Sequence, residues 1–63
     1  MYEEVRRKLT ILTEHYGVKQ SYIARELGIN RSNVCRFIKR ERELNLVYIE
    51  KLQIILKKYE GLL

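Results

Sequence analysis

Glycines at positions 17, 28 and 61 are the main helix-breaking residues of this chain, because it contains no proline. Glycine readily takes the left-handed backbone conformation that ends a helix. The segments between the glycines are rich in Leu, Glu, Lys and Arg, which are strong helix formers. We therefore predict an all-α fold in which short turns connect the helices.

Apolar residues recur at spacings of three and four in each segment, which is the pattern of a helix with one buried face. The predicted helices comprise residues 2–16, 20–27, 30–38 and 45–61. Asn30 and Asn45 are the candidate N-caps of the third and fourth helices, since an asparagine side chain can accept a hydrogen bond from the first turn. The residues expected to face the core are Tyr2, Val5, Leu9, Leu12, Tyr16, Ile23, Ala24, Leu27, Val34, Phe37, Ile38, Ile49, Leu52, Leu56 and Tyr59.

The length of 63 residues predicts a single domain over residues 1–63 with a small core and marginal stability. One cysteine, Cys35, and one histidine, His15, leave no disulfide and no cluster with metal-ligand spacing. We expect no cofactor, no metal and no small-molecule ligand. Charged residues begin at Glu3 and no apolar run is long enough for a membrane span, so we expect a cytoplasmic, nucleoid-associated protein.

The positive charge is concentrated in the middle of the chain. Residues 19–42 hold seven basic and two acidic side chains, a balance of +5, whereas the remaining residues hold six of each. A basic block of this kind is expected of a surface that binds a polyanion, although a merely solvated basic surface would give the same count.

A twenty-residue window that begins at Gln20 has a small residue, Ala24, at its fifth position and Gly28 at its ninth. Ala24 is expected where the second and third helices approach most closely, and Gly28 where the chain turns. Apolar residues that would hold the two helices together occupy the fourth, eighth, tenth, fifteenth and eighteenth positions of the window, namely Ile23, Leu27, Ile29, Val34 and Phe37. The segment QSYIARELGINRSNVCRFIK resembles the helix-turn-helix of the lambda repressor-like superfamily, which includes phage repressors, Cro proteins and small XRE-like bacterial regulators.

This resemblance implies a compact bundle of four or five helices, with the helix-turn-helix as helices two and three. It also implies that Gln20 braces the third helix and touches the DNA backbone. The chain departs from the family at Lys19, where an N-capping Ser or Thr is usual. It departs again at Ile38 and Arg40, where a glutamate and a glycine are often found. The residues in the base-reading positions of the family are Arg31, Ser32, Asn33 and Arg36.

These side chains suit the reading of base edges, because arginine makes paired hydrogen bonds to guanine and asparagine to adenine. Tyr22 could donate to a phosphate or could serve as a partly buried structural residue. The candidate contacts to the DNA backbone are Lys19, Gln20, Tyr22, Asn30, Lys39 and Arg40.

The C-terminal segment carries more apolar side chains than one amphipathic helix needs. Those beyond the core-facing set are Val47, Tyr48, Ile54, Ile55, Leu62 and Leu63. Because a contiguous apolar patch usually marks a contact surface, we predict a homodimer on a near-palindromic operator. Alternatively, a short fifth turn folds the last two leucines back onto the monomer. The predicted dimer interface comprises Tyr48, Ile55, Leu62 and Leu63.

The sequence thus favours a protein that binds double-stranded DNA in a sequence-specific way, as a transcriptional repressor or regulator of a phage, plasmid or bacterium. A protein-interaction module, antitoxin-like or anti-repressor, is the second hypothesis, in which the same helices dock a protein. An enzyme is not expected, because no pairing of nucleophile and base is evident and the domain is too small for a deep pocket.

Overall fold

The computed structural model describes the backbone of residues 2–62 and the side chains of residues 2–61. These residues form helices and connecting turns without any strand, so the predicted all-α class is confirmed. The α-helices are α1 (Tyr2–Thr10), α2 (Gln20–Leu27), α3 (Arg31–Ile38) and α4 (Leu46–Lys57). A π-helical turn, η1 (Ile11–His15), continues α1, and a short 3₁₀ turn, η2 (Glu60–Leu62), follows α4.

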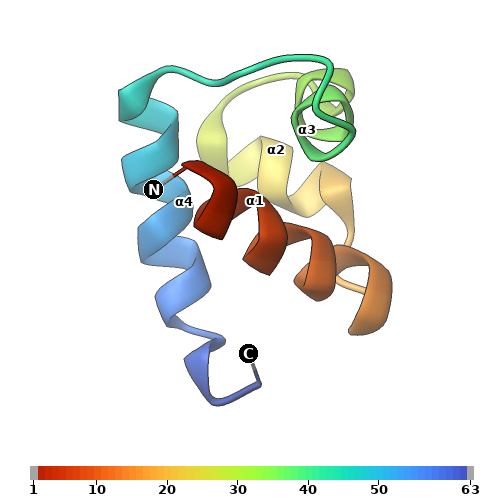
Figure 1. The fold of residues 1–63 in the computed structure, drawn as a ribbon, viewed down its shortest axis with the longest axis vertical. Helices are drawn as coiled ribbons and strands as arrows, with labels where there is room; N and C mark the ends of the chain where they lie inside the picture. Colours follow the sequence, from red (N-terminus) through yellow and green to blue (C-terminus); the bar gives the residue numbers. More distant parts are fainter. Residues whose placement is uncertain (1, 63) are drawn as a thin grey trace.

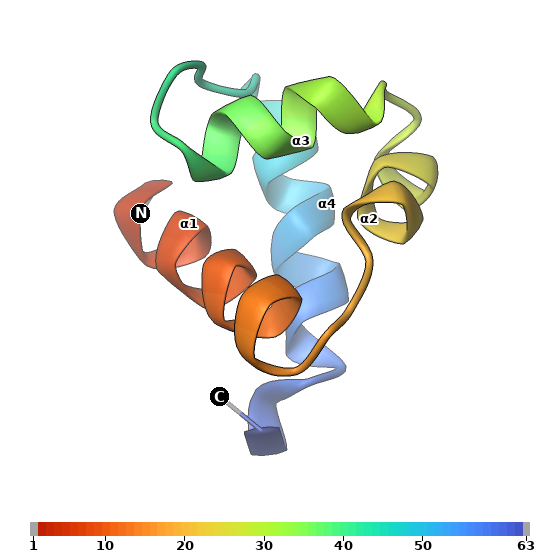
Figure 2. The same cartoon turned by 90° about the vertical axis from the view of Figure 1, so that its right-hand side faces the viewer.

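Helix α3 crosses one end of the molecule, and the C-terminal part of α4 reaches toward the opposite end (Figures 1 and 2). Both α1 and α2 pack against α3 and against α4. Phe37 of α3 is completely buried in the core that these helices share. The core residues are Val5, Leu9, Leu12, Ile23, Ala24, Leu27, Val34, Phe37, Leu44, Ile49, Leu52, Ile55 and Leu56.

Most of the predicted core is confirmed, but two tyrosines are not part of it. Tyr2 and Tyr16 retain 38% and 43% of their accessible surface. Tyr2 opens α1, and Tyr16 follows the π turn, where the Thr10 hydroxyl donates to the Arg6 carbonyl oxygen at 2.8 Å. A π turn advances each residue by a smaller angle than an α-helix, so Tyr16 does not return to the buried face.

The turn between α2 and α3 has the backbone that its sequence predicts. Gly28 lies at φ 76°, in the left-handed region. Its N–H donates to the Arg25 carbonyl at 3.2 Å, and the N–H of Ile29 donates to the Ala24 carbonyl at 3.0 Å. This pair of hydrogen bonds is a Schellman motif, which satisfies the last carbonyls of α2 and sends the chain directly into α3.

Helix α3 ends in the same way, but with arginine in the glycine position. Arg40 has φ 65°, its N–H donates to the Phe37 carbonyl at 3.2 Å, and the N–H of Glu41 donates to the Arg36 carbonyl at 2.9 Å. A side chain in this conformation costs roughly 1–2 kcal/mol. The glycine that the resemblance leads one to expect at position 40 therefore has a clear conformational reason.

Two predictions about helix ends are corrected. Asn30 and Asn45 have the extended backbone of N-cap residues, but neither side chain makes the capping hydrogen bond. The fourth helix ends at Lys57 rather than at Gly61, because the N–H groups of Lys58 and Tyr59 bond three residues back and tighten its last turn.

Ala24 is 3% exposed on α2, the helix that packs against α3. We expect Ala24→Leu to overpack this contact and to lower the free energy of unfolding by roughly 1–3 kcal/mol. Arg25→Leu places the same side chain on the exposed side of α2 and should change stability by less than about 0.5 kcal/mol. Thermal melts of both variants compare the two positions, and equal melting temperatures would contradict this account of the packing.

Candidate nucleic-acid interface

Helix α3 presents a polar stripe on the side opposite to its buried residues. Ser32, Arg36 and Lys39 follow one another at spacings of four and three, so they lie on one face, and all three are exposed. Val34 and Phe37, on the other face, are fully buried. The buried pair fixes the rotation of α3, and that rotation decides which side chains reach the solvent. Two further residues of this helix, Asn33 and Cys35, are half-buried at its flanks.

A shallow hollow of about 460 Å³ lies beside the start of α2. Lys19, Gln20 and Arg31 line it, which brings together three residues that the sequence analysis assigned to DNA binding. The first N–H groups of a helix lack intrahelical acceptors and carry partial positive charge, so the hollow combines two cationic side chains with a helix N-terminus. Glu14 contributes one negative charge to its lining.

The basic side chains of α3, and Lys39 directly after it, form no ion pair within residues 2–61. Among residues 2–61, the ion pairs involve Arg6, Lys8 and Arg40 as the basic partners, and none of them involves Arg31, Arg36 or Lys39. Their charge is therefore available to an external anion.

Arg40 differs from these three residues. Its guanidinium bonds both carboxylate oxygens of Glu3, which lies in the first turn of α1. The hydrogen bonds from Arg40, partly opposed by desolvation and reinforced by the charges of Arg40 and Arg6, lower the pKa of the Glu3 carboxyl below its ordinary value. Arg40, one of the six residues predicted to contact the DNA backbone, is thus bonded to a side chain of α1.

Tyr22 also has an intramolecular partner. It is half-buried against the core and lies beside Tyr59, which follows α4. The neighbouring Tyr59 phenol, burial and the Glu26 carboxylate all raise the pKa of the Tyr22 hydroxyl, as does its hydrogen bond with Tyr59. Tyr22 therefore fits the second of the two roles that its sequence position allows, that of a partly buried structural residue, and it is not part of the candidate interface.

Arg6 is the site residue that the sequence analysis missed. Its side chain is buried, with only 4% of the residue exposed. Its Nε donates to the Phe37 carbonyl at 2.7 Å, and its Nη2 donates to Glu43 at 2.8 Å. Its Nη1 lies 2.8 Å from Glu3, and its guanidinium carbon lies 4.5 Å from the centre of the Phe37 ring. Burial lowers the pKa of Arg6, but the carboxylates of Glu43 and Glu3 more than offset this and raise it.

This guanidinium therefore caps the C-terminal end of α3 and holds the loop that leads to α4. The only feature of the neighbouring sequence that indicates burial of Arg6 is that it directly follows Val5 and so borders the apolar stripe of α1. Its partners Phe37 and Glu43 are 31 and 37 residues away, and nothing in the periodicity of α1 points to them.

The predicted dimer interface is corrected at Ile55, which is 5% exposed and belongs to the core. Tyr48 is half-buried against the same core. The side chain of Leu62 and all of Leu63 lie outside the described residues. The large apolar side chains that α4 leaves exposed are Leu46, Val47 and Ile54, at 50%, 59% and 63%.

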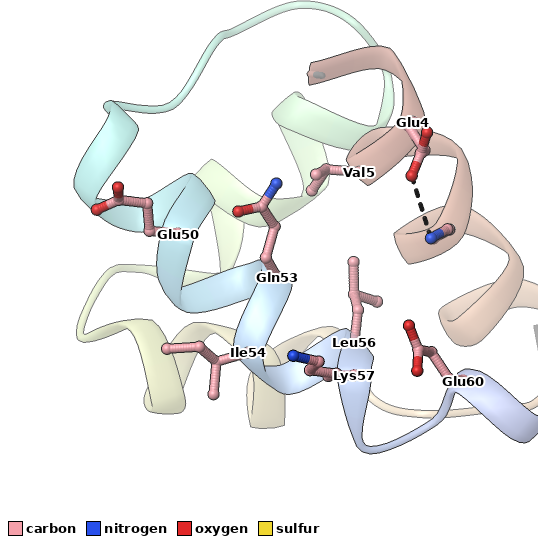
Figure 3. Close-up of a pocket in the computed structure, with 9 residues that line it drawn as sticks. Glu4, Val5, Glu50, Gln53, Ile54, Leu56, Lys57 and Glu60 are labelled. Carbon is pink, nitrogen blue, oxygen red and sulfur yellow. Dashed lines mark ion pairs between the residues drawn. The ribbon is translucent and has the colours of Figure 1, made fainter.

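A second hollow, of about 570 Å³, lies between α1 and α4 (Figure 3). Its lining carries charges of both signs, with the acids Glu4, Glu50 and Glu60 and the bases Lys8 and Lys57. Glu4 and Lys8 form an ion pair across one turn of α1 at 3.2 Å. Within residues 2–61 no three His, Cys, Asp or Glu side chains are grouped so that they could hold a metal ion, and no helix there has the length and apolar character of a membrane span.

Comparisons with family models, with curated proteins and with solved structures find no match to this chain.

Arg6→Ala removes the hydrogen bond to the Phe37 carbonyl and the buried part of the guanidinium. We expect a loss of about 1–3 kcal/mol in the free energy of unfolding, which corresponds to a fall in melting temperature of roughly 5–20 °C. Arg6→Lys should lose most of the same stability, because an ammonium cannot reproduce the forked contacts. The control is Arg7→Ala, an exposed position on the same helix, for which a fall comparable to that of Arg6→Ala would contradict the capping role.

Proposed function

We propose that this protein binds double-stranded DNA, with α2 and α3 as a helix-turn-helix and α3 as the helix that enters the major groove. The observation that carries the proposal is the outer face of α3, where Arg36 and Lys39 are exposed and free of intramolecular ion pairs among the described residues. A helix whose role is purely structural would not need a row of uncompensated cations at one end of the molecule.

The dimensions support this assignment. An α-helix with its side chains is about 10–12 Å in diameter, and the major groove of B-DNA is about 12 Å wide, so the groove can hold the eight residues of α3. Arg36 would then make paired hydrogen bonds to a guanine, and Asn33 to an adenine. Arg31 and Ser32, near the start of α3, would contact neighbouring base edges.

The hollow beside the start of α2 would receive a phosphate of the DNA backbone. Lys19 and Gln20 border it, and an anion at a helix N-terminus gains both hydrogen bonds and favourable electrostatics. Lys39, at the other end of α3, would contact the opposite strand, and Asn30 would lie close to the first of these phosphates. Contacts of this kind set the position of the protein on the duplex but carry no sequence information.

The function that follows is that of a transcriptional regulator, most simply a repressor that occludes its site. Selection of bound duplexes from a random library, followed by electrophoretic shifts on the selected site and on scrambled DNA, tests it directly. Absence of a shift on every duplex at low salt would contradict the proposal and would favour the protein-docking alternative.

Arg36 and Lys39 allow a matched test, because both are exposed basic residues less than one turn apart. We expect Arg36→Ala to weaken binding to the selected site by about 5- to 150-fold and to relax the preference at one base pair. Lys39→Ala should weaken binding to selected and scrambled DNA alike and reduce the salt dependence. The assignment of α3 as the reading helix is wrong if Arg36→Ala affects both duplexes equally.

We propose further that two copies bind together. The longest dimension of the chain is 26 Å, shorter than one DNA turn of about 34 Å, so a single copy reaches one segment of major groove. Val47 and Ile54, two turns apart on the exposed face of α4, are the apolar residues that a second copy would cover. Figure 3 shows Ile54 directed away from α1, which leaves this face open.

Ile54→Glu should weaken this pairing, whereas Gln53→Glu introduces the same charge at the neighbouring exposed position. We expect at least about 10-fold weaker self-association for Ile54→Glu, since covering an isoleucine contributes about 1.5–3 kcal/mol. Sedimentation equilibrium with and without a selected palindromic duplex measures it. A parent protein that stays monomeric in both conditions would exclude the dimer.

A further inference from the structure

Glu3 joins two arginines that have different tasks. One is Arg6, the buried cap of α3, whose Nη1 lies 2.8 Å from Glu3. The other is Arg40, which follows α3 and bonds both Glu3 carboxylate oxygens. The side chains of Glu3 and Arg40 are 56% and 67% exposed, so this second contact lies at the surface. Figure 2 shows the start of α1 beside the end of α3.

Arg40 is placed as a phosphate-binding residue would be. It directly follows Lys39, and its backbone is held by the hydrogen bond from its N–H to the Phe37 carbonyl. Only its side chain is therefore free to move. A carboxylate and a phosphate present similar pairs of oxygens to a guanidinium. The guanidinium N–H groups of Arg40 that donate to the Glu3 carboxylate are therefore the groups that would donate to a DNA phosphate.

The fold does not need the contact between Glu3 and Arg40. Without Glu3, Arg6 would keep its hydrogen bonds to the Phe37 carbonyl and to Glu43, at 2.7 and 2.8 Å. An exposed ion pair of this kind contributes at most about 1 kcal/mol. Packing therefore accounts for the contact of Glu3 with the buried Arg6 but not for its contact with Arg40.

We propose that Glu3 competes with DNA phosphate for Arg40 and thereby weakens the sequence-independent part of DNA binding. This inference rests on the proposed function. The guanidinium must exchange one anion for another on binding, so its net contribution to affinity is small. The contacts that α3 makes to base edges then account for a larger share of the affinity, which increases discrimination between sites.

Glu3→Gln and Glu4→Gln provide the matched test, because both remove one negative charge from the first turn of α1. Glu4 instead pairs with Lys8 of the same helix (Figure 3). On scrambled duplex at low salt, we expect Glu3→Gln to bind about 2- to 5-fold more tightly than Glu4→Gln. The slope of log K against log salt should steepen by about 0.9, the value for one added phosphate contact.

Arg40→Gln tests the competition from the other partner. In the parent background it should change affinity little, because Glu3 already occupies the guanidinium. In the Glu3→Gln background it should remove the gain. Equal binding by Glu3→Gln and Glu4→Gln, or an Arg40→Gln loss in the parent as large as that of Lys39→Ala, would overturn the inference while DNA binding itself stands. A parent that binds no duplex would instead overturn the proposed function. Thermal melts establish that each variant is folded.

Discussion

The buried guanidinium of Arg6 is the interaction on which the arrangement of the helices depends. It reaches from α1 to the Phe37 carbonyl at the end of α3 and to Glu43 in the loop before α4, and it packs against the Phe37 ring. In so small a core, few other contacts could join three segments at once. A charge is tolerated there because its donors meet a carbonyl and two carboxylates, so that burial leaves no unpaired group.

Helix α3 is consequently held at both of its ends. At its start, the glycine turn brings the chain from α2 into α3, and Ala24 permits close packing. At its end, Arg40 repeats the turn in a conformation that is unfavourable for a side chain, and Arg6 caps the Phe37 carbonyl. A helix fixed in this way presents one constant face to the solvent, which is what recognition of a rigid partner such as a DNA groove requires.

The excess positive charge of residues 19–42 is divided into two groups by the tertiary structure. Arg40 is bonded to an acid from α1, whereas Arg31, Arg36 and Lys39 have no such partner within residues 2–61. The net charge of residues 19–42 therefore overestimates the positively charged surface that is available to a polyanion. The proposed interface is narrower than the basic block, and it is centred on the outer face of α3.

The sequence by itself determined the helical class, the ends of α2 and α3 to within a residue, the turn at Gly28 and the buried face of α3. These features follow from local rules, since periodicity and backbone conformation depend on residues a few positions apart. Only the tertiary structure decided that Ile55 is buried and that Arg6 and Arg40 share Glu3. Each of these outcomes depends on which residues distant in sequence lie opposite a side chain, and the pattern of one helix contains no information about the surface of another.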